Sequence, residues 1–273
     1  METLKKTIII YGHGYVGNAM ENLLKKHYHV TISDPKYNEP LKTEIDNYDL
    51  AIVCVPTPMK EGTNECDIRI VENVIRDIKS DLILIKSTVE IGTTDRLKKK
   101  YKKRIVFSPE YCGESSYWTP HQFHTKIVET PFFIFGGDKE DTSVMVDYFM
   151  PVCGPTKRYI QTDAKTAELV KYMENTFYAM KIAYCYEIYE ICQKLGIDYN
   201  EVRELWVTDP RINSMHTSIF PENIFPFAGK CLPKDLNGLI QLAEKIGYEP
   251  KLLKEVWDSN LRIAEIRKKR LQK

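Results

Sequence analysis

Apolar residues in the first part of the chain gather in short runs, and segments with helical spacing lie between the runs. The runs are rich in Ile, Val, Leu and Phe and end in turn residues, as strands buried in a parallel sheet do. Strands are predicted at residues 7–11, 29–34, 49–55, 82–87, 104–107 and 132–137, and helices at 16–26, 70–78 and 93–103. This alternation predicts an α/β domain with a doubly wound, Rossmann-like parallel sheet over residues 1–162.

The pattern becomes purely helical after about Asp163. Residues 164–195 contain neither proline nor glycine, and Gly196 follows them, which predicts one long helix. Such a length suggests a helix that crosses between domains or subunits, so we expect a homodimer formed through it. Further helices are predicted at 199–208, 234–246 and 250–272. Residues 163–273 are therefore expected to form the long central helix and a small all-helical domain for dimerisation and substrate binding.

The composition argues against several classes of function. A formal net charge of +1 provides no overall field that would attract nucleic acid or an acidic membrane. No apolar run approaches the length of a membrane span, and the N-terminus does not have the pattern of a signal peptide. The seven cysteines lack the spacing of a metal site, so no metal is expected. Free thiols suggest a reducing compartment, and the expected location is the cytoplasm.

A dinucleotide-binding fingerprint follows the first predicted strand. Gly12, Gly14 and Gly17 form GxGxxG, with Tyr15 and Val16 before the last glycine. The glycines permit a tight turn, close approach of the backbone to a pyrophosphate, and close packing of helix on strand, and the phosphates rest on the helix N-terminus.

Asp34 ends the second predicted strand, where a carboxylate accepts hydrogen bonds from ribose hydroxyls. Because a carboxylate there repels a 2′-phosphate, the predicted cofactor is NAD rather than NADP.

Other polar residues cluster where parallel strands should end, at positions 56–58, 87–89 and 108–110. Lys171 and Asn175 are four residues apart in the long helix and share a face. Cys231 precedes a predicted helix, where the helix dipole favours a thiolate. A lysine on a helix is usually solvated and a cysteine is usually a small core residue, so it is the joint occurrence that indicates a site.

These motifs, in this order, resemble the UDP-glucose/GDP-mannose dehydrogenase family. The resemblance rests on 12–17, 54–58, 86–89, 108–110, the Lys171 and Asn175 helix, 209–212 and 231–235. It implies an NAD-dependent oxidoreductase that oxidises C6 of a nucleotide-linked hexose, with UDP-glucose the expected substrate, to a uronate for polysaccharide biosynthesis. Two oxidations would take place, the second through a thiohemiacetal and a thioester on Cys231.

The resemblance also implies roles for individual residues. Lys171 and Asn175 match residues that stabilise the oxyanion, and Asp235 matches a carboxylate that orders water with Thr88. Glu114 matches a general base for thioester hydrolysis, and Glu110 matches a residue that supports the site. The implied cofactor-binding residues are Gly12, Gly14, Tyr15, Val16, Gly17, Asp34, Val55, Pro56, Thr57, Ser87 and Thr88. The implied substrate-binding residues are Glu110, Lys171, Asn175, Arg211 and Gly229.

Two departures from the family pattern keep alternatives open. Lys230 adjoins Cys231 where family members usually carry small residues, and the chain ends at Lys273 where they continue into a second Rossmann-like domain. The chain is therefore expected to lack that nucleotide-sugar domain. One alternative is a two-electron 3-hydroxyacid dehydrogenase that uses Lys171 and does not need Cys231. Another is an NAD-binding homologue that is catalytically impaired. The hexose, the nucleotide and the pathway are left open.

Overall fold

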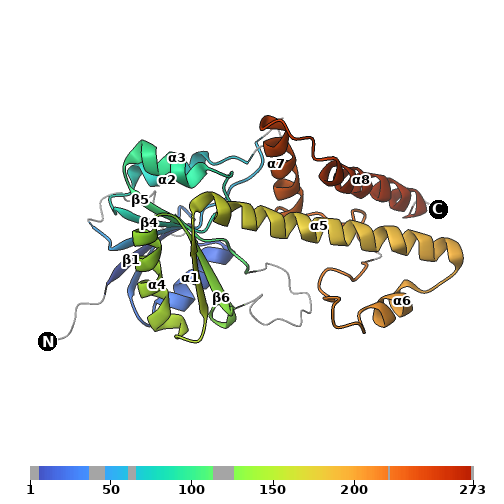
Figure 1. Ribbon diagram of the computed structural model, residues 1–273, viewed down its shortest axis with the longest axis horizontal. Helices are drawn as coiled ribbons and strands as arrows, with labels where there is room; N and C mark the ends of the chain where they lie inside the picture. Colours follow the sequence, from blue (N-terminus) through green and yellow to red (C-terminus); the bar gives the residue numbers. More distant parts are fainter. Residues whose placement is uncertain (1–5, 37–46, 61–65, 113–125, 221, 272–273) are drawn as a thin grey trace. The chain divides into compact units, whose positions relative to one another are not determined.

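The computed structural model describes residues 6–36, 47–60, 66–112, 126–220 and 222–271 (Figure 1). Contacts divide the chain into two compact units. The first comprises Met1–Pro58 and Cys66–Lys171, and the second comprises Met59–Glu65 and Tyr172–Lys273. The boundary that the sequence suggests, between residues 162 and 163, stays a prediction.

A single sheet with the strand order β2-β1-β3-β4-β5-β6-β7 organises the first unit. The strands are β1 (Thr7–Tyr11), β2 (His29–Ser33), β3 (Leu50–Val53), β4 (Leu82–Ile85), β5 (Arg104–Phe107), β6 (Phe132–Gly136) and β7 (Arg158–Thr162). Strands β1 to β5 are parallel to one another. The chain order reverses at β1, which has β2 on one side and β3 on the other. In such folds the crevice at this reversal binds the ligand.

Strand β6 departs from the purely parallel sheet that the sequence predicts. It pairs with β5 in the antiparallel sense, and Phe107 opposite Gly136 is the pairing that joins them. Strand β7, which is parallel to β6, has mostly exposed or half-exposed residues and gives no apolar run in the sequence. Strand direction depends on how the chain crosses the sheet, so an apolar run alone does not reveal it.

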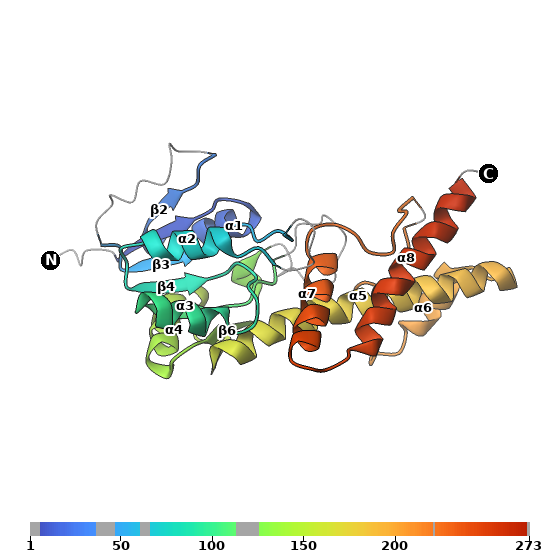
Figure 2. The ribbon, with the colours of Figure 1, turned by 90° about the horizontal axis from the view of Figure 1, so that it is seen from above.

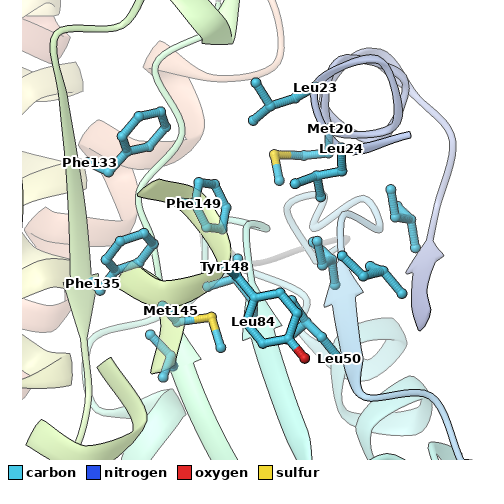
Figure 3. Packing of buried hydrophobic residues seen from close by; sticks show 14 of the residues in the cluster. Met20, Leu23, Leu24, Leu50, Leu84, Phe133, Phe135, Met145, Tyr148 and Phe149 are labelled. Carbon is cyan, nitrogen blue, oxygen red and sulfur yellow. The ribbon is translucent and has the colours of Figure 1, made fainter. Parts of the chain in front are cut away.

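Helices cover both faces of the sheet, which confirms the doubly wound architecture. The helices of this unit are α1 (Tyr15–Leu24), α2 (Arg69–Asp77), α3 (Thr93–Tyr101), the short η2 (Ile127–Glu129) and α4 (Lys139–Cys153). Ile8 and Ile10 face a cluster that includes Met20 of α1 and Phe149 of α4 (Figure 3). Ile9, between them, faces the opposite cluster with α2 and α3. Alternate residues of each strand thus enter different cores.

The second unit is helical. It contains most of α5 (Ala164–Leu195), followed by α6 (Tyr199–Trp206), α7 (Leu232–Lys245) and α8 (Lys251–Leu271) (Figure 2). Its core joins Ala183 of α5, Leu236 of α7 and Val256 of α8. The buried guanidinium of Arg267 donates to the carbonyls of Asn223 and Phe220, which anchors the loop before α7. Across the described residues, no helix is both long and apolar enough to cross a membrane.

Candidate active site

The loops that follow β1 to β5 meet along one edge of the sheet, because these strands are parallel. Backbone hydrogen bonds continue the sheet beyond the strand ends. The amide of Cys54 donates to Tyr11, that of Lys86 to Val53, and that of Ser108 to Ile85, at 2.7–2.9 Å. The polar residues that the sequence places after β3, β4 and β5 therefore lie on the edge where such folds bind ligands.

The three glycines of the first loop meet different constraints. Gly12 has φ +87° and lies against the Cys54 carbonyl, so it shapes the turn. A Cβ at Gly17 would lie 1.9 Å from the Gly12 carbonyl oxygen, so Gly17 lets α1 approach the loop. A Cβ at Gly14, the N-cap residue of α1, would meet no described atom within 4 Å. Gly14 thus borders open space at a helix N-terminus, which suits a pyrophosphate.

Asp34 lies one residue beyond β2, rather than at its end as the sequence suggests. Its carboxylate accepts hydrogen bonds from the amides of His13 (2.6 Å) and Lys36 (2.8 Å). Burial alone would raise the pKa of Asp34, but these hydrogen bonds outweigh it and hold the pKa below its ordinary value. The charged carboxylate is thereby fixed beside the glycine loop. The residues present therefore fit the phosphates and ribose of NAD.

The loops after β3 and β4 are joined by short polar contacts. Ser87 donates from its hydroxyl to the Val55 carbonyl at 2.7 Å. The buried thiol of Cys66 lies 3.9 Å from the Thr57 carbonyl and 3.7 Å from the Thr88 carbonyl, and these two acceptors share its one proton. Pro56 is exposed between Val55 and Thr57. These contacts therefore fix the two loops, and the predicted cofactor-binding residues in them, relative to each other.

A cluster that includes Glu110 and Lys171 forms after β5. The Lys171 Nζ donates to the Glu110 backbone carbonyl at 2.6 Å and lies 5.6 Å from the centre of the Tyr111 ring. The Glu110 carboxylate pairs with Lys86 at 3.1 Å, and the side chains of both are at least nine-tenths buried. The sequence does not indicate this pairing of Lys86, because a lysine after an apolar strand does not reveal its partner.

The second unit places Cys231, Asn175 and Asp235 in one connected group. Cys231 is the N-cap residue of α7, and its carbonyl accepts a hydrogen bond from the Asp235 amide at 2.9 Å. The Asp235 carboxylate is 1% exposed, accepts from the Asn175 amide at 2.5 Å and pairs with Lys234 at 2.9 Å. Lys234 is a second buried lysine that the sequence analysis did not select, although it adjoins a residue that was selected.

Exposure separates Cys231 from the other thiols. All seven cysteines lie in described parts of the chain and none forms a disulfide, but Cys231 is the one that is exposed. Burial raises the pKa of Cys54 and raises that of Cys112 to about 11. Because the thiolate is the nucleophile, those two cysteines are poorly suited to attack a carbonyl.

The remaining predicted residues fall outside these groups. Glu114 lies outside the described residues. Arg211 is exposed and makes a bidentate contact with Asp209. Gly229 has φ +84° in an exposed part of the loop before Cys231. Within the described ranges, no group of three or more His, Cys, Asp or Glu residues could hold a metal.

Comparisons with known proteins agree with this arrangement. A model of the NAD-binding domain of the UDP-glucose/GDP-mannose dehydrogenase family matches residues 20–145, and a model of that family's central domain matches 165–262. The UDP-glucose 6-dehydrogenase of Rickettsia prowazekii is 29% identical over 82% of this chain and 52% of its own length. The UDP-N-acetyl-D-mannosamine dehydrogenase of Methanocaldococcus jannaschii is 34% identical over 64% of this chain and 42% of its own length.

The fold is similar to that of a UDP-glucose dehydrogenase from Pyrobaculum islandicum. The TM-score is 0.77 at 23% identity, over 94% of this chain and 68% of that one. The chain spans about half the length of the curated relatives it matches. The match to the family's NAD-binding domain confirms the predicted cofactor, NAD.

Proposed function

We propose that this chain, which belongs to the UDP-glucose/GDP-mannose dehydrogenase family, carries out the NAD-dependent oxidation of C6 of a nucleotide-linked hexose to the carboxylate. The observation that carries the proposal is Cys231, an exposed thiol at the N-terminus of α7. An alcohol dehydrogenase needs no nucleophile, whereas oxidation of an aldehyde to an acid proceeds readily from a tetrahedral adduct. A nucleophilic thiol therefore favours the four-electron reaction.

The residues of the first unit would hold the cofactor. The open face at Gly14 would receive the pyrophosphate, and the Asp34 carboxylate would accept hydrogen bonds from the adenosine ribose. The loops with Val55, Pro56, Thr57, Ser87 and Thr88 would border the nicotinamide. Bound NAD supplies the electron acceptor for each of the two oxidations.

Cys231 would act in the second oxidation. Its sulfur attacks the C6 aldehyde and forms a thiohemiacetal, whose oxidation gives a thioester. Cys231 is the N-cap residue of α7, and the N-terminus of a helix stabilises nearby negative charge. Water then hydrolyses the thioester, which releases the uronate and restores the thiol.

Other residues would stabilise charge and move protons in this scheme. Lys171 and Asn175 would hold the oxyanion that develops on the C6 oxygen. Asp235 and Thr88 would order the water, and Glu114 would act as the general base for hydrolysis. Glu110 would support the site through its contact with Lys171. Arg211 and Gly229 would contact the substrate.

UDP-glucose is the substrate that we propose, because UDP-glucose 6-dehydrogenases recur among the relatives. UDP-N-acetyl-D-mannosamine dehydrogenases are also similar, so both nucleotide sugars belong in the test. The measurement is the number of NADH formed per sugar consumed. For the wild type we expect two NADH per sugar, and for Cys231→Ser we expect that no uronate forms. Cys153→Ser, which removes a thiol at the end of α4, is the control and should still give two.

Other stoichiometries identify the alternatives. One NADH per substrate, with Cys231→Ala fully active on a 3-hydroxyacid, would replace the proposal with the two-electron reaction. NAD binding in calorimetry, without binding or turnover of any nucleotide hexose, would instead indicate a non-catalytic homologue.

We also propose that the chain forms a homodimer through α5 and acts in the cytoplasm. Six large apolar residues of this helix are exposed, and at 3.6 residues per turn they lie within about 40° of one line. They are Leu169, Met173, Phe177, Tyr184, Ile191 and Leu195. Such a stripe on a helix of 32 residues is typical of an interface.

Light scattering at several concentrations tests the dimer. Phe177→Glu places a charge on the stripe and should yield monomers. Gln193→Glu adds the same charge about 160° around the helix from Phe177, on an exposed position, and should leave the dimer intact. A monomeric wild type would overturn the proposal.

A further inference from the structure

Lys86 is a buried cation at the carboxyl end of β4, with partners in the turn after β5. The residue is 6% exposed. Its Nζ lies 3.1 Å from the Glu110 carboxylate and donates to the Pro109 carbonyl at 3.0 Å and to the Ser108 hydroxyl at 3.2 Å. One ammonium group thus contacts three consecutive residues of that turn.

The side-chain carboxylate and the backbone carbonyl of Glu110 have different partners. Its carboxylate oxygen Oε1 accepts hydrogen bonds from the amides of Tyr111 (2.9 Å) and Cys112 (2.7 Å), while Oε2 faces Lys86. Its backbone carbonyl points to Lys171 and accepts from Nζ at 2.6 Å. The direction of that carbonyl depends on the conformation of the turn, which the carboxylate and Lys86 fix together.

The Tyr111 ring is held by the same turn. It packs edge-on against Phe132 with ring centres 5.0 Å apart, and the Lys171 Nζ lies 5.6 Å from its centre. Lys171 is therefore oriented by a carbonyl and by an aromatic face, and both belong to the turn that Lys86 clamps.

We propose that Lys86 is a positioning residue for Lys171, acting through Glu110. A buried ion pair is costly to desolvate, and apolar residues often give equal or greater stability. Here the pair fixes a backbone carbonyl against the ammonium group that would hold the C6 oxygen. This inference rests on the proposed function for its kinetic consequence, but not for the orientation of Lys171.

The variants must separate positioning from folding. Lys86→Met alone would leave the Glu110 carboxylate buried without its cation, which is strongly destabilising and would confuse a folding defect with a loss of positioning. The double variant Lys86→Met, Glu110→Gln avoids a buried lone charge, and the glutamine oxygen can still accept from the turn amides. The control is Lys103→Met, because Lys103 is a half-buried lysine of the same unit that also donates to backbone carbonyls, those of Ile75 and Ile78.

The first measurement does not require activity. Acetylation of Lys171 by an N-hydroxysuccinimide ester is followed by peptide mass spectrometry in the folded protein. We expect the rate at Lys171 to rise at least threefold in the double variant and to stay unchanged in Lys103→Met. An unchanged rate in the double variant would overturn the inference, whatever the substrate of the protein proves to be.

The second measurement uses turnover, corrected for the fraction of molecules that bind NAD. Misplacement of a catalytic group by about 1 Å can cost about 100-fold, so kcat should fall about 10- to 100-fold in the double variant while KM changes less than threefold. A larger isotope effect with substrate deuterated at C6 should accompany the fall. A merely structural role predicts unchanged kcat per folded molecule, and that result would refute positioning. If the wild type oxidises no nucleotide hexose, the proposed function fails, and the acetylation rate still decides the role of Lys86.

Discussion

The glycine loop offers a substitution pair that separates folding from cofactor binding. Gly17→Ala places a Cβ 1.9 Å from the Gly12 carbonyl oxygen, whereas real Cβ atoms essentially never approach closer than 3.0 Å. Gly14→Ala adds the same methyl group, but no described atom lies within 4 Å of it. The backbone of Gly14 also has φ −70°, which alanine adopts without strain.

The expected magnitudes differ accordingly. In Gly17→Ala the first turn of α1 and the loop must separate by about 1 Å, and the obstacle is backbone that cannot rotate away. Overpacking costs about 1–3 kcal/mol, and this case belongs at the upper end. A loss of about 3 kcal/mol lowers the melting temperature by about 6–12 °C for a unit of this size. Gly14→Ala should change stability by less than about 0.5 kcal/mol.

Binding of NAD should be affected most by Gly14→Ala, the variant that changes stability least. The methyl group of Gly14→Ala occupies the space that the pyrophosphate needs, so we expect the Kd for NAD to rise by about tenfold or more, which is about 1.4 kcal/mol. Wild-type protein at an NAD concentration of about 100 times Kd gains about 2.7 kcal/mol of apparent stability, and the variant should gain about half of that or less. Thermal melts with and without NAD, together with calorimetric titration, measure both effects.

Two results would refute this reasoning. If Gly14→Ala melts as low as Gly17→Ala without NAD, then Gly14 constrains the fold and does not border an open cofactor site. If Gly14→Ala binds NAD as tightly as the wild type, the pyrophosphate does not rest on this loop.

Three further predictions concern buried or partly buried polar groups. Because the pKa of Asp34 is lowered, the stability that its carboxylate contributes is present above the ordinary aspartate pKa and is lost as the pH falls below about 4. In urea unfolding, the free energy of unfolding of Asp34→Asn should therefore decrease less than that of the wild type as the pH is lowered through this range. Glu168→Ala should cost about 2–6 kcal/mol, since it strips the buried amide of Thr94 and the half-buried amide of Gly92 of their acceptor, and Glu187→Ala on the exposed surface should cost almost nothing. Burial raises the pKa of Glu168, so the wild type also loses stability as the pH rises through that raised value, and the alanine variant should not. Asn175→Ala should lower the free energy of unfolding by about 1.5–3 kcal/mol, because the buried Asp235 carboxylate loses a hydrogen bond; an unchanged urea midpoint would contradict this.

The sequence predicts the fold where burial dictates residue type. The strands β1, β3, β4 and β5 are apolar because both faces of the sheet are covered, and α5 matches the prediction at both ends because glycine and proline are excluded from its interior. Strand β7 lies at the edge of the sheet and has mostly exposed or half-exposed residues, so its sequence carries no such signal. The direction of β6 is a tertiary property that no local pattern encodes.

The part of the candidate site that can be predicted from the sequence is the part that forms a local motif. Gly12, Gly14, Gly17 and Asp34 form a local motif whose spacing is set by one strand, one turn and one helix. Lys86 and Glu110 meet only because β4 and β5 are neighbours in the sheet. Their pairing depends on strand order, which has to be known before the contact can be inferred.

Both units hold a buried Lys–carboxylate pair next to a residue with a proposed catalytic role. In the first unit, Glu110 of the pair offers its carbonyl to Lys171. In the second, Asp235 of the pair donates its amide to the carbonyl of Cys231. In both cases the link runs through a backbone group, so the side-chain charges of the pair stabilise a conformation; Lys171 is held by its own Nζ, whereas the Cys231 link does not involve the thiol. Because such pairs are costly to desolvate, apolar replacements of both members should retain the fold while the neighbouring group loses its orientation. Stability and turnover should therefore respond differently to the same substitution, and this difference distinguishes a positioning role from simple structural support.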